Sequence, residues 1–145
     1  MGAVLSYMGS ILSYLFGGSV VAGEDSASDG QSGVTAFHSS ARWQLHFNSM
    51  KNTTQLMVID FAASWCGPCK LMEPAVHALA AKFTDVQFAK IDVDELPDVA
   101  QEFGVQAMPT FVLVKKGNEV DRIVGAKKEE LQSKIEKHRP FQAAA

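Results

Sequence analysis

The sequence contains very little cysteine. Of its 145 residues two are cysteine, Cys66 and Cys69, and only Gly67 and Pro68 separate them. A secreted disulfide scaffold spreads several cysteines along its chain, and a disulfide that closes so short a loop stabilises a fold little. We therefore expect the pair to carry chemistry rather than to hold the fold together.

Ligands for a structural zinc ion are also scarce. Such a site takes about four ligands, usually from a second cysteine pair or from paired histidines. The four histidines are scattered along the chain, at His38, His46, His77 and His138. We expect no bound metal.

The chain has no excess of positive charge. Its 13 lysines and arginines stand against 16 aspartates and glutamates, which gives a formal net charge of −3. Proteins that bind nucleic acid usually carry a basic patch, so we expect no nucleic-acid partner.

Charged side chains are absent from the start of the chain, where the first is Glu24. Residues 1–23 are apolar but interrupted by glycine and serine, and residues 23–33 are rich in Gly, Ser, Asp and Ala, as flexible linkers are. We therefore divide the chain into three parts, an N-terminal extension, a folded domain and a short tail, over residues 1–33, 34–140 and 141–145.

The first six residues fit the pattern for N-myristoylation at Gly2, with Ser6 at the favoured position. One acyl chain binds membranes weakly and reversibly, so we predict reversible contact with a membrane surface. A secretory signal, a mitochondrial presequence, a spanning helix and an unmodified leader are the alternatives. The stretch lacks the positive charge of both targeting signals, and its Gly and Ser content does not favour a spanning helix.

Hydrophobic patterns after residue 33 predict nine elements. The predicted strands cover residues 34–37, 55–62, 86–93, 110–115 and 119–124. The predicted helices cover residues 41–51, 66–83, 95–103 and 127–138. The last two strands are joined by Lys116-Gly117-Asn118, which predicts a hairpin. This order indicates an α/β fold, a mixed sheet between layers of helices.

The two cysteines lie at the start of a predicted helix. Unpaired backbone N–H groups and the helix dipole favour a thiolate on Cys66, which can attack a disulfide. Cys69, one turn later and more sheltered, can then release the mixed disulfide. Gly67 leaves the approach to sulfur open, and Pro68 suits an early helical position because its missing N–H would have no partner there.

The run Trp65-Cys66-Gly67-Pro68-Cys69 resembles the active-site signature of the thioredoxin family. Further landmarks of that family follow at matching positions over residues 34–140: Asp60, Pro74, Met108-Pro109-Thr110 and Gly125. The resemblance implies the thioredoxin fold, a mixed five-stranded sheet sandwiched by four helices. The long extension and the run Ser40-Ala41-Arg42-Trp43 are similar to plant h-type thioredoxins with an extended N-terminus.

Two strand residues match positions that tune the cysteines in this family. Asp60 lies in an apolar run, where desolvation should raise the pKa of its carboxyl group. The resemblance implies that Asp60 takes the proton of Cys69 and that Lys90 lies near this aspartate and modulates it. Without the resemblance, Asp60 could equally cap the following loop, and Lys90 could be a solvated strand lysine.

The resemblance also implies a substrate-binding rim around the cysteines. Pro109 matches the family's cis-proline, and Met108 would offer its backbone to an extended substrate segment. Gly125 and Ala126 would form the opposite side of the groove, together with Trp65, which we expect to be exposed.

These features predict a thiol–disulfide oxidoreductase that reduces disulfides in target proteins. The resemblance implies that an NADPH-dependent thioredoxin reductase re-reduces it and that no cofactor is bound. We expect a cytoplasmic monomer, or a mitochondrial or secretory protein if the leader is cleaved. The alternatives are a thioredoxin-fold interaction module or holdase, and an oxidant or isomerase of the secretory pathway, against which Pro68 argues.

Overall fold

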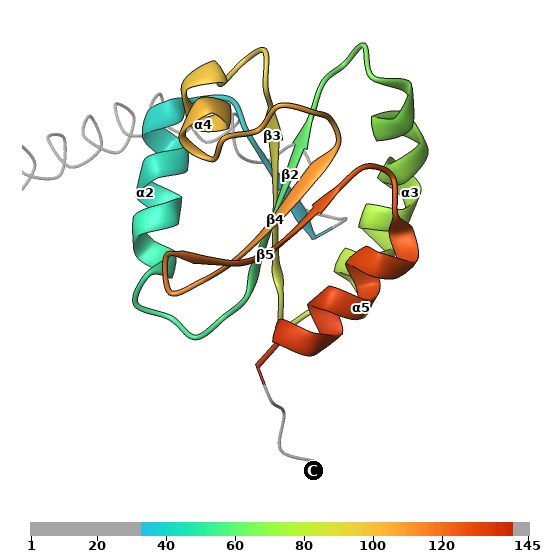
Figure 1. Cartoon of the computed structure of the whole chain (residues 1–145). Helices are drawn as coiled ribbons and strands as arrows, with labels where there is room; N and C mark the ends of the chain where they lie inside the picture. The colour runs from blue at the N-terminus through green and yellow to red at the C-terminus, as the bar shows by residue number, and fades with distance from the viewer. Residues whose placement is uncertain (1–32, 141–145) are drawn as a thin grey trace, which may run out of the picture.

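The computed structural model describes residues 33–140, which form a sheet between two layers of helices (Figure 1). The five strands are β1 (Val34–Phe37), β2 (Met57–Ala62), β3 (Gln87–Asp92), β4 (Thr110–Lys115) and β5 (Asn118–Val124). The four helices are α2 (Ser40–Met50), α3 (Gly67–Lys82), α4 (Pro97–Glu102) and α5 (Lys128–His138). The predicted order of elements is confirmed. Gly2, the leader and the tail lie outside the described residues.

The strands form one mixed sheet in the order β1-β3-β2-β4-β5. The strands β1 and β2 both pair with β3 in parallel, whereas β4 pairs antiparallel with β2 and with β5. All six residues of the central strand β2 are buried. Burial on both faces explains why this strand reads as a continuous apolar run rather than an alternating one.

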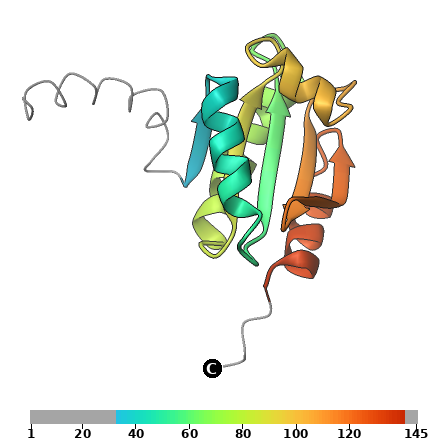
Figure 2. The same ribbon diagram turned by 90° about the vertical axis from the view of Figure 1, so that its left-hand side faces the viewer.

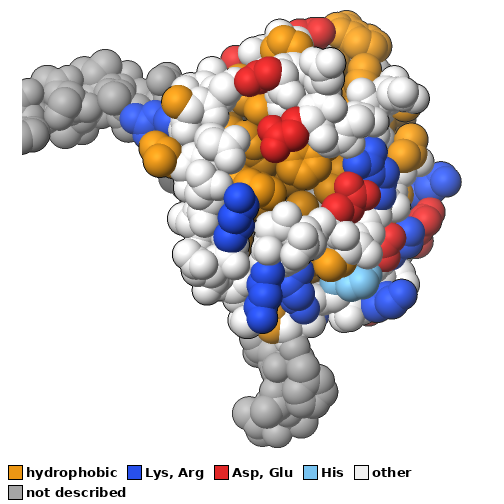
Figure 3. Space-filling view, turned by 60° about the vertical axis from the view of Figure 1, so that its left-hand side comes forward, with side chains coloured by type: hydrophobic (Ala, Val, Ile, Leu, Met, Phe, Trp, Pro, Cys, Tyr) orange, Lys and Arg blue, Asp and Glu red, His pale blue; other side chains and the backbone are white. Residues whose placement is uncertain are grey.

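The two faces of the sheet are covered by different helices. Figures 1 and 2 show α2 and α4 on one side of the sheet and α3 and α5 on the other. Successive residues of β2 alternate between the two layers, since Val58 packs with α3 and α5 whereas Ile59 packs with α2 and α4. On the side of α2 and α4, hydrophobic side chains gather in a surface hollow bordered by charged groups (Figure 3), and the partly buried Phe103 and Val105 lie at the edge of this layer.

Two boundaries lie two residues from their predicted positions, whereas the other bounds agree to within one residue. The helix α4 begins at Pro97 rather than at residue 95. The backbone N–H groups of Asp94 and Glu95 donate to Asp92 Oδ1, at 2.8 and 3.4 Å, so residues 92–95 form a side-chain-capped turn before the helix. The strand β2 begins at Met57, two residues after the apolar run begins. No helix within residues 33–140 is long and apolar enough to cross a membrane.

Candidate active site

The topology brings the loops that carry the predicted site residues to one edge of the sheet. The strands β2, β3 and β5 run in the same direction, so the loops that follow them leave at the same edge. Because β4 runs the opposite way, the loop that precedes it lies there too. This edge therefore collects the cysteine pair after β2, the acidic turn after β3, Met108-Pro109 before β4 and Gly125 after β5.

The cysteines lie at the N-terminus of α3 and form a disulfide with a Cα–Cα distance of 5.3 Å. Cys66 is the N-cap residue of α3, and the backbone N–H of Cys69 donates to Cys66 Sγ at 3.2 Å. An N–H group aimed at this sulfur stabilises a thiolate on it when the disulfide is reduced. Pro68 occupies the first turn, and a Cβ added to Gly67 would meet no atom within 4 Å beyond its chain neighbours and the backbone of its own helix.

The predicted difference in exposure between Cys66 and Cys69 is absent in the disulfide form. Cys66 is 4% exposed and Cys69 is 5% exposed. The disulfide packs against Ala62 and Ala63, with Val93 and Met108 at its margin. Cys66 Sγ lies 3.7 Å from the carbonyl oxygen of Met108, so the loop before β4 covers it.

Of the predicted rim residues, Met108 packs against this disulfide. The Met108–Pro109 peptide bond is cis, as the resemblance implied, and the N–H of Gly125 donates to the carbonyl oxygen of Pro109 at 2.8 Å. Gly125 has a φ of +102°, a conformation that favours glycine. Ala126 follows and is exposed. A pocket of about 500 Å³ adjoins this rim, between α4 and the loop that carries Met108.

Trp65 lies beside the disulfide with 67% of its surface exposed, as predicted. Its indole Nε1 donates to Asp94 Oδ2 at 2.9 Å. Asp94 was not among the predicted site residues, although the acidic residues that follow the predicted third strand could have indicated a role for it at this edge. The hydrogen bond fixes the orientation of a large apolar surface directly next to the reactive sulfurs.

Asp60 lies in the middle of the sheet on the face that α3 covers. In the sheet register it stands between Lys90 of β3 and Phe111 of β4. It is 7% exposed, and its Oδ1 is buried without a hydrogen-bond partner, which argues against a loop-capping role. Burial raises the pKa of Asp60 to about 7, the charge of Lys90 opposes this, and the charge of Glu73 adds to it.

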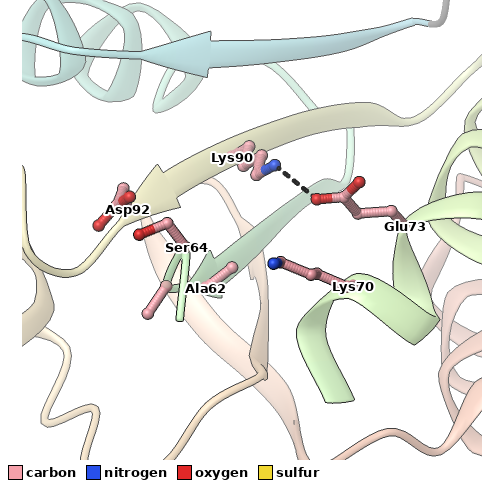
Figure 4. Close-up of a pocket in the computed structure, with 7 residues that line it drawn as sticks. Ala62, Ser64, Lys70, Glu73, Lys90 and Asp92 are labelled. Atoms are coloured by element: carbon pink, nitrogen blue, oxygen red, sulfur yellow. Dashed lines mark hydrogen bonds and ion pairs between the residues drawn. The ribbon is translucent and has the colours of Figure 1, made fainter. Parts of the chain in front are cut away.

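Lys90 forms its ion pair with Glu73 of α3 rather than with Asp60, at an Nζ–Oε1 distance of 3.3 Å. The pair lines a pocket of about 310 Å³ next to the cysteine loop, into which Lys70 also points (Figure 4). Glu73 was not among the predicted site residues. Its position four residues after Cys69, on the same side of the helix, could have indicated it.

Metal ligands do not converge within residues 33–140, where no group of three or more His, Cys, Asp or Glu side chains is arranged to hold an ion. The described residues bring together a redox-active cysteine pair, a buried carboxyl group and one exposed indole.

Comparison with known proteins agrees with this geometry. A family model described as thioredoxin matches residues 36–137. Thioredoxin H2 of Arabidopsis thaliana is 60% identical over 136 residues, which cover 91% of this chain and 99% of that protein. Thioredoxin H2-1 of Oryza sativa subsp. japonica is 58% identical over 106 residues, which cover 73% of this chain and 77% of that protein.

Solved structures give the same result. The crystal structure of thioredoxin NaTrxh from Nicotiana alata is 71% identical with a TM-score of 0.73, and the match covers 74% of this chain and 93% of that one. A poplar thioredoxin h matches with a TM-score of 0.68 at 35% identity, covering 72% of this chain and 94% of that one. The five-stranded mixed sheet with four helices is thus the thioredoxin fold, the Cys66–Cys69 pair is its redox centre, and the chain belongs to the thioredoxin family.

Proposed function

We propose that this chain reduces disulfides in target proteins, with Cys66 as the attacking sulfur and Cys69 as the resolving sulfur. The observation that carries the assignment is the hydrogen bond from the Cys69 N–H to Cys66 Sγ at the N-terminus of α3. It favours negative charge on Cys66 when the pair is reduced, and the thiolate is the nucleophile in disulfide exchange.

In the first step the Cys66 thiolate attacks one sulfur of the target disulfide. The target S–S bond breaks, its other sulfur leaves as a thiolate, and a mixed disulfide joins Cys66 to the target. Because Cys66 Sγ is covered in the oxidised form, the attack requires the reduced thiolate to become accessible on the side of Trp65 and Met108.

In the second step Cys69 loses its proton to Asp60, directly or through water, and attacks Cys66 Sγ. The mixed disulfide breaks, the target leaves with its second sulfur reduced, and the Cys66–Cys69 disulfide forms. Two electrons have then passed to the target. A carboxyl group with a pKa near 7 is suited to this task, since it can both accept and return a proton at neutral pH. The pairing of Lys90 with Glu73 supports a tuning role for Lys90.

Target binding is assigned to the rim. An extended target segment would pair with the backbone of Met108, beside Pro109, while Gly125, Ala126 and Trp65 form the facing side. The exposed indole of Trp65 beside the disulfide supports this assignment.

The oxidised pair would be re-reduced by an NADPH-dependent thioredoxin reductase, with no cofactor bound to this chain. We place the monomeric protein in the cytoplasm, with myristoylation at Gly2 allowing reversible contact with membrane surfaces. The sequence pattern at the N-terminus is what supports this part of the proposal.

Insulin reduction with Cys66→Ser and Cys69→Ser variants tests the cysteine assignment. Cys66→Ser should be inactive, whereas Cys69→Ser should attack once and remain joined to its target as a mixed disulfide visible by mass. Substantial turnover by Cys66→Ser, or no trapped adduct with Cys69→Ser, would contradict the roles. An inactive wild-type protein that still suppresses aggregation of unfolded clients would instead favour a holdase.

A further inference from the structure

Three ionisable side chains follow one another in space from the interior of the sheet to the solvent. Asp60 is buried, Lys90 stands beside it in the register of β2 and β3, and Glu73 approaches Lys90 from α3. The side chains of Lys90 and Glu73 are 33% and 48% exposed, so their pair lies at the mouth of the pocket. Figure 4 shows the carboxylate of Glu73 reaching across the pocket to the Lys90 ammonium group.

We infer that Glu73 is a positioning residue for the exchange reaction: by holding the Lys90 ammonium group at the pocket mouth, it leaves Asp60 free to accept the proton of Cys69. This inference rests on the proposed role of Asp60 and adds a third member to the Asp60–Lys90 pair.

The physical reason is competition for one cation. An ammonium group that is free to approach Asp60 stabilises the carboxylate and makes it a weaker base. Glu73 offers Lys90 an exposed partner, where no buried charge has to be compensated. The buried and unpartnered Oδ1 of Asp60 agrees with a carboxyl group that has not captured the lysine.

The surroundings of Asp60 support a specific role for Glu73 rather than a general effect of charge. From β3, Lys90 and Asp92 face the pocket, and from α3, Lys70 and Glu73 do so. From β4, the neighbour of Asp60 is the apolar Phe111. The remaining titratable groups of α3 on this side are Cys69, one turn before Glu73, and His77, one turn after it. Among these groups, Glu73 is the one that forms the ion pair with Lys90.

The variant Glu73→Gln tests the inference, because it keeps the shape of the side chain and removes its charge. Glu136→Gln on α5 is the matched control, since Glu136 accepts a hydrogen bond from Gln132 and lies outside the pocket. Carbon-13 NMR titration of the Asp60 carboxyl group in the oxidised protein gives its titration midpoint directly. We expect Glu73→Gln to lower this midpoint by about 0.5–1 pH unit and Glu136→Gln to leave it in place.

The rate of target release from the Cys66 mixed disulfide gives a second readout. In Glu73→Gln the Asp60 carboxyl group should be ionised at lower pH, but its carboxylate should accept a proton less readily. Plots of the target-release rate against pH for Glu73→Gln and wild type should therefore cross. Above pH 8 the variant should release the target about twofold to threefold more slowly, and near pH 6 it should be the faster of the two. A uniform change at all pH values would indicate a structural effect and overturn the inference.

The variant Lys90→Met shows whether Glu73 acts through the lysine. In that background the Glu73→Gln substitution should move the Asp60 midpoint less than it does in the wild type, because there is no ammonium group to release. An equal shift in both backgrounds would contradict the proposed positioning role.

Failure of the proposed base is distinguishable from failure of this inference. If Asp60→Asn leaves the release profile unchanged, Asp60 is not the base and the proposed function is wrong at that step. If Asp60→Asn abolishes the pH dependence of target release but Glu73→Gln leaves the titration midpoint of Asp60 unchanged, Asp60 is the base and the role of Glu73 is refuted.

Discussion

Replacing Asp60 with asparagine should make the oxidised protein more stable at neutral and alkaline pH. The carboxyl group has an ordinary pKa of 3.8, and burial raises the pKa of Asp60 in the folded protein to about 7. Because the folded state holds the proton more tightly, the stability from this group is complete below pH 4 and is lost as the pH rises through 7. Ionised Asp60 therefore destabilises the fold, and asparagine cannot ionise.

The magnitude follows from the two pKa values. They differ by about three pH units, and each unit corresponds to 1.36 kcal/mol, so the penalty approaches ~4 kcal/mol above pH 8. The buried amide of asparagine has its own desolvation cost of about 1–3 kcal/mol where it lacks a partner, as Oδ1 of Asp60 does. We expect a net gain of about 2 kcal/mol at pH 8, which corresponds to roughly 8 °C in Tm for a domain of this size.

Urea unfolding of the oxidised protein at several pH values between 4.5 and 8.5 measures this effect. Wild type should lose stability across the range, whereas Asp60→Asn should have a flatter profile. The control Asp98→Asn removes an exposed carboxyl group that accepts a hydrogen bond from Ser40. Because Asp60 is intact in this control, its stability should still fall with rising pH as in the wild type. An Asp60→Asn variant that is less stable at pH 8 and retains the full wild-type slope would refute the buried-carboxyl argument.

Two further predictions concern the rim and the leader. Asp94→Ala should remove the hydrogen bond to the Trp65 indole and raise the KM for a protein disulfide about threefold, which corresponds to about 0.7 kcal/mol for one exposed hydrogen bond. Reduction of a small-molecule disulfide should stay unchanged. An equal loss with both substrates would argue against a target contact by Trp65. Gly2→Ala should move the protein from the membrane fraction to the soluble fraction of the cell without changing insulin reduction, and membrane association that survives the substitution would contradict acylation at Gly2.

Most of the fold could be predicted from the sequence because its signals are local. The apolar run around Asp60 indicated a strand buried on both faces, and the structure confirms it as the central strand. The starts of α3 and α4 depend on capping. The helix α4 begins later than predicted because the Asp92 side chain accepts hydrogen bonds in the preceding turn, which a hydrophobic pattern does not indicate. The order of strands in the sheet could not be derived from such patterns, since it depends on contacts between distant segments.

The candidate site shows the same division between local and distant information. The cysteine pair and its place at a helix N-terminus follow from one short run of sequence. The cover over Cys66 comes from Met108, which is 42 residues away in the chain, so its burial was missed. Glu73 and Asp94 were missed for the same reason, because each acts on a partner from another element, 17 residues away for Lys90 and 29 for Trp65.

The hydrogen bond from the Gly125 N–H to the Pro109 carbonyl oxygen has a consequence for target selection. It joins the loop before β4 to the loop after β5 through their main chains. For a target bound as we propose, the receiving surface is already ordered, and binding requires little loss of conformational entropy from the protein. Recognition through such a fixed main-chain frame depends on whether a target can present an extended strand at its disulfide, and only weakly on which amino acids that strand contains. A target-binding surface of this kind would accept many different target proteins rather than one particular sequence.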